Sequence, residues 1–357
     1  MLANLFQSPS PPLIGVDISS SAVKMVEIEQ VGKNLLRIER YAIESLPKDA
    51  VTDGNIMNLE AVAETMRRAW KRMGSRIKNV SLALPAAAVI TKKIIVPAGL
   101  REDELEAQVE TEANQYIPFA LDEVNLDFQV LGPSPSGPEE VEVLIAASRK
   151  EKVEDRVAAA ESAGLKAVVV DVESYATQTA CELVSQQLPN AGRDQTVAVV
   201  DIGAAMMHIN VLHNGQSIYM REQSFGGNQL TQEIQRRYSL SSDEADIAKR
   251  QGGLPENYEA EVLQPFMDTL ALEVARAIQF FFSSSQFNRV DHILLAGGCA
   301  MIPGLDEIVA TRAQSSTMIA NPFASMALSS RIKPKQLTLD APALLIACGL
   351  AMRRFDK

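Results

Sequence analysis

Two aspartates, Asp17 and Asp201, stand at the same point of two similar stretches of the chain. The first stretch reads PLIGVDISSSAVKMVEI from Pro12, and the second reads TVAVVDIGAAMMHINVL from Thr196. In each, an apolar run ends on the aspartate, a turn of small residues follows, and a second apolar run returns. The offset of 201 − 17 = 184 residues is far longer than a solenoid repeat, so it indicates two related domains.

The small residues of both turns favour the binding of an anion by backbone N–H groups, because short side chains let the anion approach closely. The first turn carries Ser19, Ser20 and Ser21, and the second begins at Gly203. Lys24, on the returning strand of the first hairpin, can add a point positive charge. Two such hairpins facing each other would hold a polyphosphate between them.

Each aspartate is a poor ligand for phosphate but a good outer ligand for hydrated Mg²⁺, which keeps several waters and takes few carboxylates. Asp17 and Asp201 would then flank one metal ion. The alternative is two ordinary β-hairpins, because turn chemistry alone favours aspartate at such positions. A single hairpin would favour that alternative, whereas the repeated one favours a nucleotide bound with Mg²⁺.

Two glycine pairs stand where bare backbone could meet a ligand. Gly226 and Gly227 introduce an expected helix whose free N–H groups could meet a ribose or phosphate, the alternative being a plain helix start. Gly297 and Gly298 follow the expected strand Val290–Ala296. A glycine pair at the end of a parallel strand marks a place where a ligand can lie against the backbone.

Composition limits the other possibilities. A chain of 357 residues suits two or three domains. The net charge of −11 gives no basic footprint and argues against nucleic acid as a partner. The three cysteines have no CxxC spacing, so they support neither a disulfide framework nor a zinc site, and they fit a reducing cytoplasm. The histidines, His208 among them, form no metal-binding pattern, and a structural or surface role is expected for each.

The sequence offers no segment for crossing a membrane, because no apolar run reaches the required length. The opening MLANLF before a Ser/Pro stretch lacks the features of a secretory signal. We expect a disordered or weakly membrane-touching tail there.

Residues 86–150 have no counterpart in the second half, which indicates an inserted small α/β module. Its expected elements are the strands Val89–Val96, Val124–Leu131 and Val141–Ala147, the helix Arg101–Tyr116 and a loop over Gly132–Glu140.

Outside the insert, strands are expected within 13–43, at Asn79–Leu84, at Ala167–Asp171 and in the second hairpin. The expected helices are Leu59–Met73, Lys150–Ala163, Tyr175–Gln187, Gln229–Tyr238, Glu244–Arg250, Glu259–Phe287 and Ala343–Arg353. A linker over 188–195 separates the halves.

Within the insert, Tyr116, Ile117 and Phe119 place three large apolar groups around the helix-ending Pro118. Extra modules on a duplicated scaffold are plausible places for specific recognition, so these residues are candidates for contact with a partner. The alternative is that they seal the core of the module.

The two hairpins and the two glycine pairs resemble the actin, hexokinase and heat-shock-ATPase superfamily over nearly the whole chain. The resemblance implies an α/β fold of duplicated actin-like (ribonuclease-H-like) domains that bind ATP and Mg²⁺. The family's phosphate loops match Ile14–Lys24 and Val199–Met207, and its adenosine loop matches Leu294–Leu305. Its connecting helices match Glu173–Leu183 and Pro342–Met352.

The same resemblance implies roles for further residues. Glu173 aligns with a water-positioning catalytic carboxylate, although an acid at a helix N-terminus also suits the helix dipole. Glu233 and Lys249 fall where family members place polar groups near the ribose and adenine. Ala204 and Ala205 depart from the Gly or Thr that active members commonly carry, which implies slow or absent hydrolysis.

Within this superfamily, the insert falls where the cell-division protein FtsA carries its extra subdomain. The motifs GVDISSSAVK, NQYIPF, VAVVDIGA, FGGNQLTQEIQRRY and KRQGGLP are similar to those of the actin-like proteins of type IV pilus assembly. This implies a cytoplasmic ATP-binding scaffold, peripheral to the inner membrane, whose partner is the short cytoplasmic tail of a membrane-anchored assembly protein. FtsA's C-terminal membrane helix has no match here.

The predicted domains are 1–190 with 340–357 as the first actin-like domain, 86–150 as the insert, and 191–339 as the second. Two other functions stay open from sequence. A filament-forming actin-like ATPase, or another homo-oligomer, is one. A sugar kinase of the same fold is the other, although no motif for a second substrate pocket is present.

Overall fold

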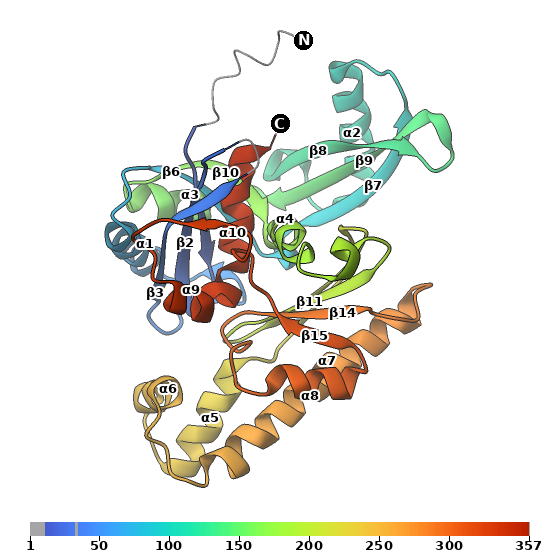
Figure 1. Ribbon diagram of the computed structural model, residues 1–357. Helices are drawn as coiled ribbons and strands as arrows, with labels where there is room; N and C mark the ends of the chain where they lie inside the picture. The colour runs from blue at the N-terminus through green and yellow to red at the C-terminus, as the bar shows by residue number, and fades with distance from the viewer. Residues whose placement is uncertain (1–10, 33–34, 357) are drawn as a thin grey trace.

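The computed structural model describes residues 11–32 and 35–356. The expected N-terminal tail lies outside the described residues, as do Lys33, Asn34 and Lys357. The described chain forms two large sheets, each with helices against its faces, and a smaller three-stranded sheet that projects from the first (Figure 1).

The first sheet starts with an antiparallel meander of β1 (Ile14–Ile18), β2 (Ala22–Gln30) and β3 (Leu36–Ser45). The strand β6 (Asn79–Leu84) then pairs parallel with β1, and β10 (Lys166–Val172) pairs parallel with β6. A two-residue strand, β16 (Ala327–Leu328), joins the edge beside β3. The order is β10-β6-β1-β2-β3-β16.

The second sheet repeats this arrangement. Its meander is β11 (Thr196–Ile202), β12 (Met207–His213) and β13 (Gln216–Gln223), followed by the parallel strands β14 (His292–Ala296) and β15 (Ser316–Ile319). The strand order is β13-β12-β11-β14-β15, which is third-second-first-fourth-fifth when the strands are counted along the chain. The first five strands of the first sheet have the same order. The sheet topology therefore repeats as the paired aspartate turns predict.

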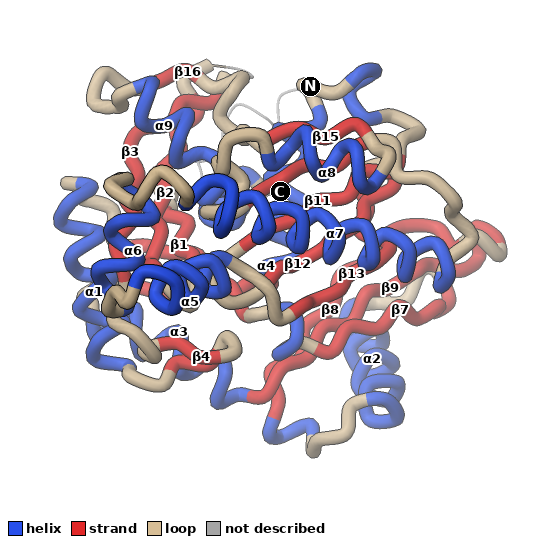
Figure 2. Tube along the Cα trace, turned by 90° about the horizontal axis from the view of Figure 1, so that it is seen from below, coloured by secondary structure: helices blue, strands red, loops and turns tan. Residues whose placement is uncertain are grey.

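Helices cover the outer face of each sheet. On the first sheet these are α1 (Leu59–Met73) and α3 (Lys150–Ser162), whose apolar residues share a core with β1 and β6. On the second sheet they are α5 (Gly227–Tyr238), α7 (Gln264–Ser284) and α8 (Leu305–Ala313). Figure 2 shows α7 and α8 lying across that sheet, with α5 and α6 (Ser242–Gln251) at one end.

Two helices, α4 (Glu173–Ser185) and α10 (Leu345–Met352), pack against each other between the halves. Their crossing is very close, because a Cβ added at Gly349 would lie 1.8 Å from the carbonyl oxygen of Ala176. A Cβ added at Gly15 of β1 would likewise lie 2.0 Å from the carbonyl oxygen of Ala347. Small residues thus let α10 contact both β1 and α4 at the backbone.

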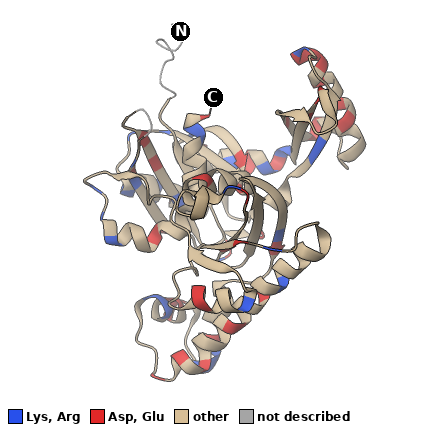
Figure 3. Ribbon diagram, turned by 45° about the vertical axis from the view of Figure 1, so that its right-hand side comes forward, with Lys and Arg blue, Asp and Glu red and all other residues tan. Residues whose placement is uncertain are grey.

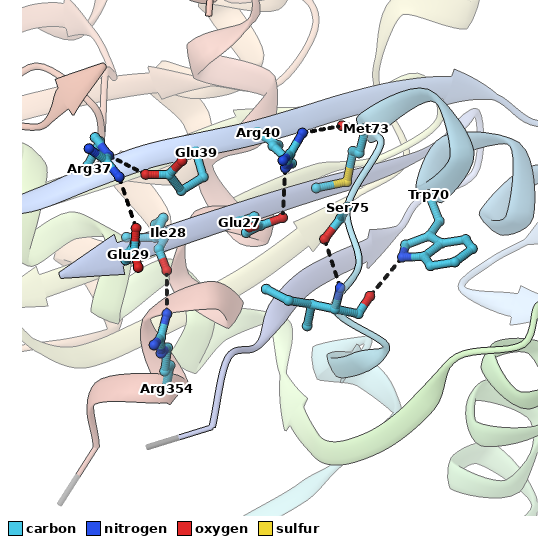
Figure 4. Close-up of polar contacts among 11 residues, drawn as sticks. Glu27, Ile28, Glu29, Arg37, Glu39, Arg40, Trp70, Met73, Ser75 and Arg354 are labelled. Atoms are coloured by element: carbon cyan, nitrogen blue, oxygen red, sulfur yellow. Dashed lines mark hydrogen bonds and ion pairs between the residues drawn. The ribbon is translucent and has the colours of Figure 1, made fainter. Parts of the chain in front are cut away.

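The C-terminal segment returns to the first sheet. It comprises β16, α9 (Pro334–Asp340), the 3₁₀ turns Ala341–Leu344 and Arg353–Phe355, and α10. Apolar residues from Phe323 onward pack against β2 and β3, so we propose that the first domain includes the residues from about 321 rather than only 340–357. Figure 4 shows Arg354 donating to the carbonyl of Ile28 on β2 at 3.1 Å.

Side-chain contacts hold the outer strands of the first sheet in place (Figure 4). Arg40 on β3 pairs with Glu27 on β2 at 3.5 Å and donates to the carbonyl of Met73 at the end of α1. Trp70 on α1 donates through Nε1 to the carbonyl of Ile77 at 2.7 Å. The connection from α1 into β6 is thereby fixed against the meander.

The insert is a sheet of order β7-β9-β8 with one helix on it. Its elements are the 3₁₀ turn Ala86–Ala88, β7 (Ile90–Pro97), α2 (Glu102–Tyr116), the 3₁₀ turn Leu121–Glu123, β8 (Val124–Ser134) and β9 (Gly137–Arg149). It has a hydrophobic core of its own. Acidic side chains gather on α2 (Figure 3).

The expected loop over Gly132–Glu140 is wrong. The two strands continue through it and close at Ser134 and Gly137, which pair with each other. Pro133 is tolerated because β8 is an edge strand, and the register is irregular beside it. Turn-forming residues therefore mark a hairpin here rather than an unstructured segment.

Other boundaries shift by a few residues. The expected helix Glu259–Phe287 begins as a π-helical turn, Glu259–Leu263, and continues as α7 with Pro265 in its first turn. The expected linker contains the 3₁₀ turn Pro189–Gly192. The short strands β4 (Val51–Thr52), β5 (Asn55–Ile56), β15 and β16 and the short helix α9 were not expected.

Candidate functional site

The two aspartate hairpins each present an acid opposite a cation. Asp17 on β1 pairs in register with Lys24 on β2, and the lysine Nζ lies 2.8 Å from Asp17 Oδ2. Asp201 on β11 is likewise opposite His208 on β12 in the strand register. The offset of 208 − 24 = 184 equals the offset between the aspartates. His208 is therefore the counterpart of Lys24, and the sequence reasoning missed it.

Lys24 shows that the two halves meet at this point. Burial alone would lower its pKa, but the carboxylates of Asp17, Asp201 and Glu173 raise it above the ordinary value. Lys24 comes from the first sheet and Asp201 from the second, so one ammonium group lies in the field of carboxylates from both. The structure thereby brings the predicted Asp17, Asp201, Lys24 and Glu173 together.

Glu173 is the first residue of α4, directly after β10. Burial, reinforced by the charge of Asp17, raises its pKa from 4.5 to about 7, although His208 and Arg156 act in the opposite direction. A carboxylate with a pKa near the working pH can take up and release a proton, as a general base requires. The pKa of Asp201 is also raised, by burial first.

His208 is a cation at neutral pH. Burial would lower its pKa, but Glu222, with which it forms an ion pair of 3.6 Å, and then Glu173 and Asp201 raise it to about 9. The site therefore combines the carboxyl groups of Asp17, Asp201, Glu173 and Glu222 with the cationic side chains of Lys24 and His208. The signal that could have found His208 in the sequence is its repeat position, 184 residues after Lys24.

The first phosphate loop is closed by its own backbone. The N–H and the hydroxyl of Ser19 both donate to the carbonyl of Ala22 at 3.0 Å. Within the described chain, the hydroxyls of Ser20 and Ser21 make no hydrogen bond, and both residues are partly exposed. They are free to donate to an anion. Arg156, buried on α3, fixes the start of this loop by donating to the carbonyl of Ile18 at 3.1 Å.

The second phosphate loop contacts the start of α5. Gly203 donates its N–H to the carbonyl of Met206 at 2.9 Å. Its own carbonyl accepts from the N–H of Gly227 at 3.0 Å, and the next carbonyl accepts from Asn228 at 2.8 Å. The expectation of free N–H groups at this helix start is therefore wrong. A Cβ on Gly226 would lie 2.5 Å from the Gly203 carbonyl oxygen, so the glycine is needed for this packing.

The Gly297-Gly298 loop lies directly on the second aspartate. Gly297 has φ +83°, and a Cβ there would lie 2.5 Å from Asp201 Oδ1. Its N–H donates to the carbonyl of Pro342, at the start of the C-terminal helical segment. Gly298 is exposed, and a Cβ there would meet open space. The loop thus presents bare backbone beside the carboxylate.

Lys249 and Glu233, expected near the ribose and adenine, have different surroundings. Lys249 on α6 reaches the start of α5, where its Nζ donates to Thr231 Oγ1 at 2.6 Å and to the Gly227 carbonyl at 3.4 Å. Glu233 forms an ion pair with Arg236 on the same helix. Lys249 therefore lies beside the glycine pair, whereas Glu233 is engaged along α5.

The residues present fit a hydrated Mg²⁺ ion. Among the described residues, no group of three or more His, Cys, Asp or Glu side chains forms a ready metal cage. Mg²⁺ does not need one, because it keeps several waters and binds through one or two carboxylates and substrate phosphates. Asp17 and Asp201, from facing hairpins that act on one ammonium group, provide such a pair.

The candidate partner residues of the insert separate into two kinds. Ile117 is 8% exposed and belongs to the hydrophobic core of the insert, as the alternative interpretation expected. Tyr116 is 48% exposed with Lys92 over its ring, and Phe119 is 37% exposed with Arg149 over its ring. Of these three residues, the two aromatic ones are exposed and Ile117 is buried.

A family model described as type IV pilus assembly protein PilM matches residues 15–355. The chain belongs to this family. The match confirms the resemblance to the actin-like proteins of type IV pilus assembly.

Three solved structures are similar over nearly the whole chain. The chain is similar to one in the "PilM-PilN type IV pilus biogenesis complex", with 28% identity, 98% of this chain and 100% of that chain covered, and a TM-score of 0.80. Ethanolamine utilization protein EutJ from Carboxydothermus hydrogenoformans matches at 15% identity over 97% and 90%, with a TM-score of 0.56. MreB5 of Spiroplasma citri bound to ADP matches at 14% over 98% and 100%, with a TM-score of 0.51.

These matches confirm the predicted actin-like fold. In the described part of this PilM-family chain, no helix has both the length and the apolar character needed to span a bilayer.

Proposed function

We propose that this chain is an ATP-binding, actin-like scaffold of type IV pilus assembly that binds the cytoplasmic tail of the inner-membrane protein PilN. The observation that carries the nucleotide part is the convergence of Asp17, Lys24, Asp201 and His208 from two facing hairpins. The partner part is supported by membership of the PilM family and by similarity to a chain of the PilM-PilN complex. The protein would work in the cytoplasm, held at the inner membrane through this partner.

Each predicted nucleotide residue has a role that its surroundings allow. Asp17 and Asp201 would hold hydrated Mg²⁺, and Lys24 would turn from Asp17 to a phosphate. The hydroxyls of Ser20 and Ser21 would donate to phosphate oxygens, with Gly203 closing the second loop. The N–H of Gly226 donates to Gln229 Oε1 and that of Gly227 donates to the Gly203 carbonyl, so this pair would shape the cleft rather than donate to phosphate.

The adenosine end of the site would lie between two elements. Gly297 and Gly298 would lie beneath the nucleoside, because the exposed Gly298 offers a flat backbone surface. Lys249 would approach from α6 and Glu233 from α5, the latter after leaving its contact with Arg236.

The test is calorimetry of Mg-ATP binding to the wild type, to Asp17→Ala and to Asp201→Ala. Each substitution is expected to weaken binding about tenfold or more, which corresponds to roughly 1.4 kcal/mol. The exposed Asp122 of the insert, replaced by Ala, is the control and is expected to leave affinity unchanged. Unchanged affinity in both cleft variants would reject the assignment.

Hydrolysis is proposed to be slow, with Glu173 as the group that positions or deprotonates water. Its pKa of about 7 suits a base, but Ala204 and Ala205 offer no hydroxyl to the phosphate. We expect turnover below about 1 per second, the lower end for kinases. Single-turnover measurements on the wild type and Glu173→Ala decide this, and fast turnover that survives the substitution would contradict it.

The partner surface is proposed to include Tyr116 and Phe119, while Ile117 supports them from the core. An extended peptide can add main-chain hydrogen bonds at a sheet edge while its apolar side chains contact aromatic rings. Fluorescence anisotropy with a labelled peptide from the PilN cytoplasmic N-terminus measures the affinity. Tyr116→Ala or Phe119→Ala is expected to weaken it about tenfold, the effect of losing an aromatic anchor, without loss of ATP binding.

The matched control is Phe280→Ala on α7, because that ring is also exposed and also lies under an arginine, Arg221, at 4.1 Å. A similar loss of peptide affinity in the control would show that the effect is not specific to the insert. Full affinity after removal of residues 86–150 from an otherwise folded chain would place the groove elsewhere.

A further inference from the structure

Glu222 links the candidate nucleotide site to the start of the insert. Its Oε1 lies 3.6 Å from His208 Nδ1 within the second sheet. The same oxygen accepts from the backbone N–H of Ala87 at 3.3 Å, across 135 residues of sequence. Ala87 belongs to the 3₁₀ turn that connects β6 of the first sheet to β7 of the insert. One carboxylate oxygen therefore contacts His208 of the second sheet and the backbone of the turn that leads into the insert.

The turn that carries Ala87 is also held from the insert side. The hydroxyl of Ser148, on the central strand β9, donates to the carbonyl of Ala88 at 2.8 Å. Ser148 is buried, so this bond is shielded from water. A continuous series of contacts thus runs from His208 through Glu222 and Ala87-Ala88 to the middle strand of the insert.

The geometry at Glu222 leaves room for a change. Both of its contacts are longer than the usual 2.9–3.0 Å of an N–H···O bond. His208 Nδ1 and the N–H of Ala87 both face this one oxygen. A small cavity lined by Ala86, Glu173, Asp201, His208 and Glu222 lies beside them, and side chains there have space to move.

We propose that Glu222 is a positioning residue shared by His208 and the start of the insert, so that a terminal phosphate drawing His208 away tightens the Glu222–Ala87 bond. This inference rests on the proposed nucleotide function. The ligand is a nucleoside triphosphate with its metal, because a diphosphate lacks the terminal phosphate that would draw His208 away. By linkage, whatever tightens the start of the insert also favours the triphosphate.

Hydrogen exchange of the full-length chain tests the proposal, with peptides that cover residues 86–96. We compare the protein with saturating Mg-ADP and with a non-hydrolysable Mg-ATP analogue. In the wild type, the triphosphate is expected to slow exchange about tenfold relative to the diphosphate, the effect of strengthening one hydrogen bond to a charged group.

Two substitutions of Glu222 separate its two contacts. Glu222→Gln keeps an oxygen for Ala87 but loses the ionic attraction to His208, so slow exchange is expected with both nucleotides. Glu222→Ala loses both contacts, so fast exchange is expected with both. The control Lys152→Met removes a 2.9 Å hydrogen bond between α3 and Asn55, also next to the insert but without contact to His208. It is expected to keep the wild-type response.

Each outcome decides the proposal. A full nucleotide response in either Glu222 variant, or its loss in Lys152→Met, would overturn it. If calorimetry shows that the wild type binds the triphosphate but exchange does not respond, the link through Glu222 is overturned and the proposed nucleotide function is not. A wild type that binds no nucleotide would overturn this inference together with the proposed function.

Discussion

The perturbed carboxylate of Glu173 predicts a stability that depends on pH. Its pKa is about 7 in the folded protein against an ordinary 4.5, because the group is buried near Asp17. The difference of about 2.5 units corresponds to roughly 3 kcal/mol, at 1.36 kcal/mol per unit. The attraction of His208, which by itself lowers the pKa of Glu173, is already contained in this value.

The sign follows from where the proton binds. Below about pH 4.5 the group is protonated in both the folded and the unfolded chain, and it contributes no penalty. Between about 4.5 and 7 the unfolded chain ionises first, so the free energy of unfolding falls as pH rises. Above about pH 7 the penalty is complete. Glu173→Gln is therefore expected to be more stable than the wild type by up to about 3 kcal/mol at pH 8, and by much less at pH 5.

Urea unfolding of the nucleotide-free proteins at pH 5 and pH 8 measures this difference. Glu161→Gln, at an exposed position on α3, controls for the replacement of a glutamate and is expected to show no such change. A Glu173→Gln variant that is less stable at pH 8, or whose advantage is the same at both pH values, would refute the reasoning.

Two further predictions concern packing. Gly297→Ala places a methyl 2.5 Å from Asp201 Oδ1 at φ +83° and is expected to cost about 1–3 kcal/mol and to weaken Mg-ATP binding. Gly298→Ala, which meets open space, is expected to stay within about 0.5 kcal/mol; equal losses in urea unfolding would count against the assigned geometry. Ile117→Ala is expected to cost about 2–5 kcal/mol as a buried core residue. Thermal denaturation should show a smaller loss for the exposed Tyr116→Ala, and the reverse order would be inconsistent with this burial.

The sequence predicts the duplicated fold well because repetition is visible in it. The two aspartate turns share an order of apolar run, acid and small residues, and that order depends only on local backbone requirements. The same repetition contains His208 at the position that matches Lys24. A histidine considered without that match indicates no particular role. The repeat position of His208 therefore indicates its role better than its residue type does.

Other features depend on contacts that no local pattern contains. The N–H groups of Gly227 and Asn228 pair with carbonyls more than twenty residues away, so whether they were free could not be read from the helix start. Glu222 meets Ala87 only because the two halves fold against each other. The Pro-rich segment 132–140 reads as a loop because prolines in an edge strand and prolines in a loop look alike in sequence.

The contact of Gly349 with the backbone of Ala176 bears on how this protein can diverge. Elsewhere in a core, a smaller side chain at one position can be compensated by a larger side chain at a neighbouring position. At this crossing there is no side chain to exchange, and one added carbon separates two helices. We therefore expect substitutions on the surfaces of both halves to be tolerated far better than any substitution at position 349.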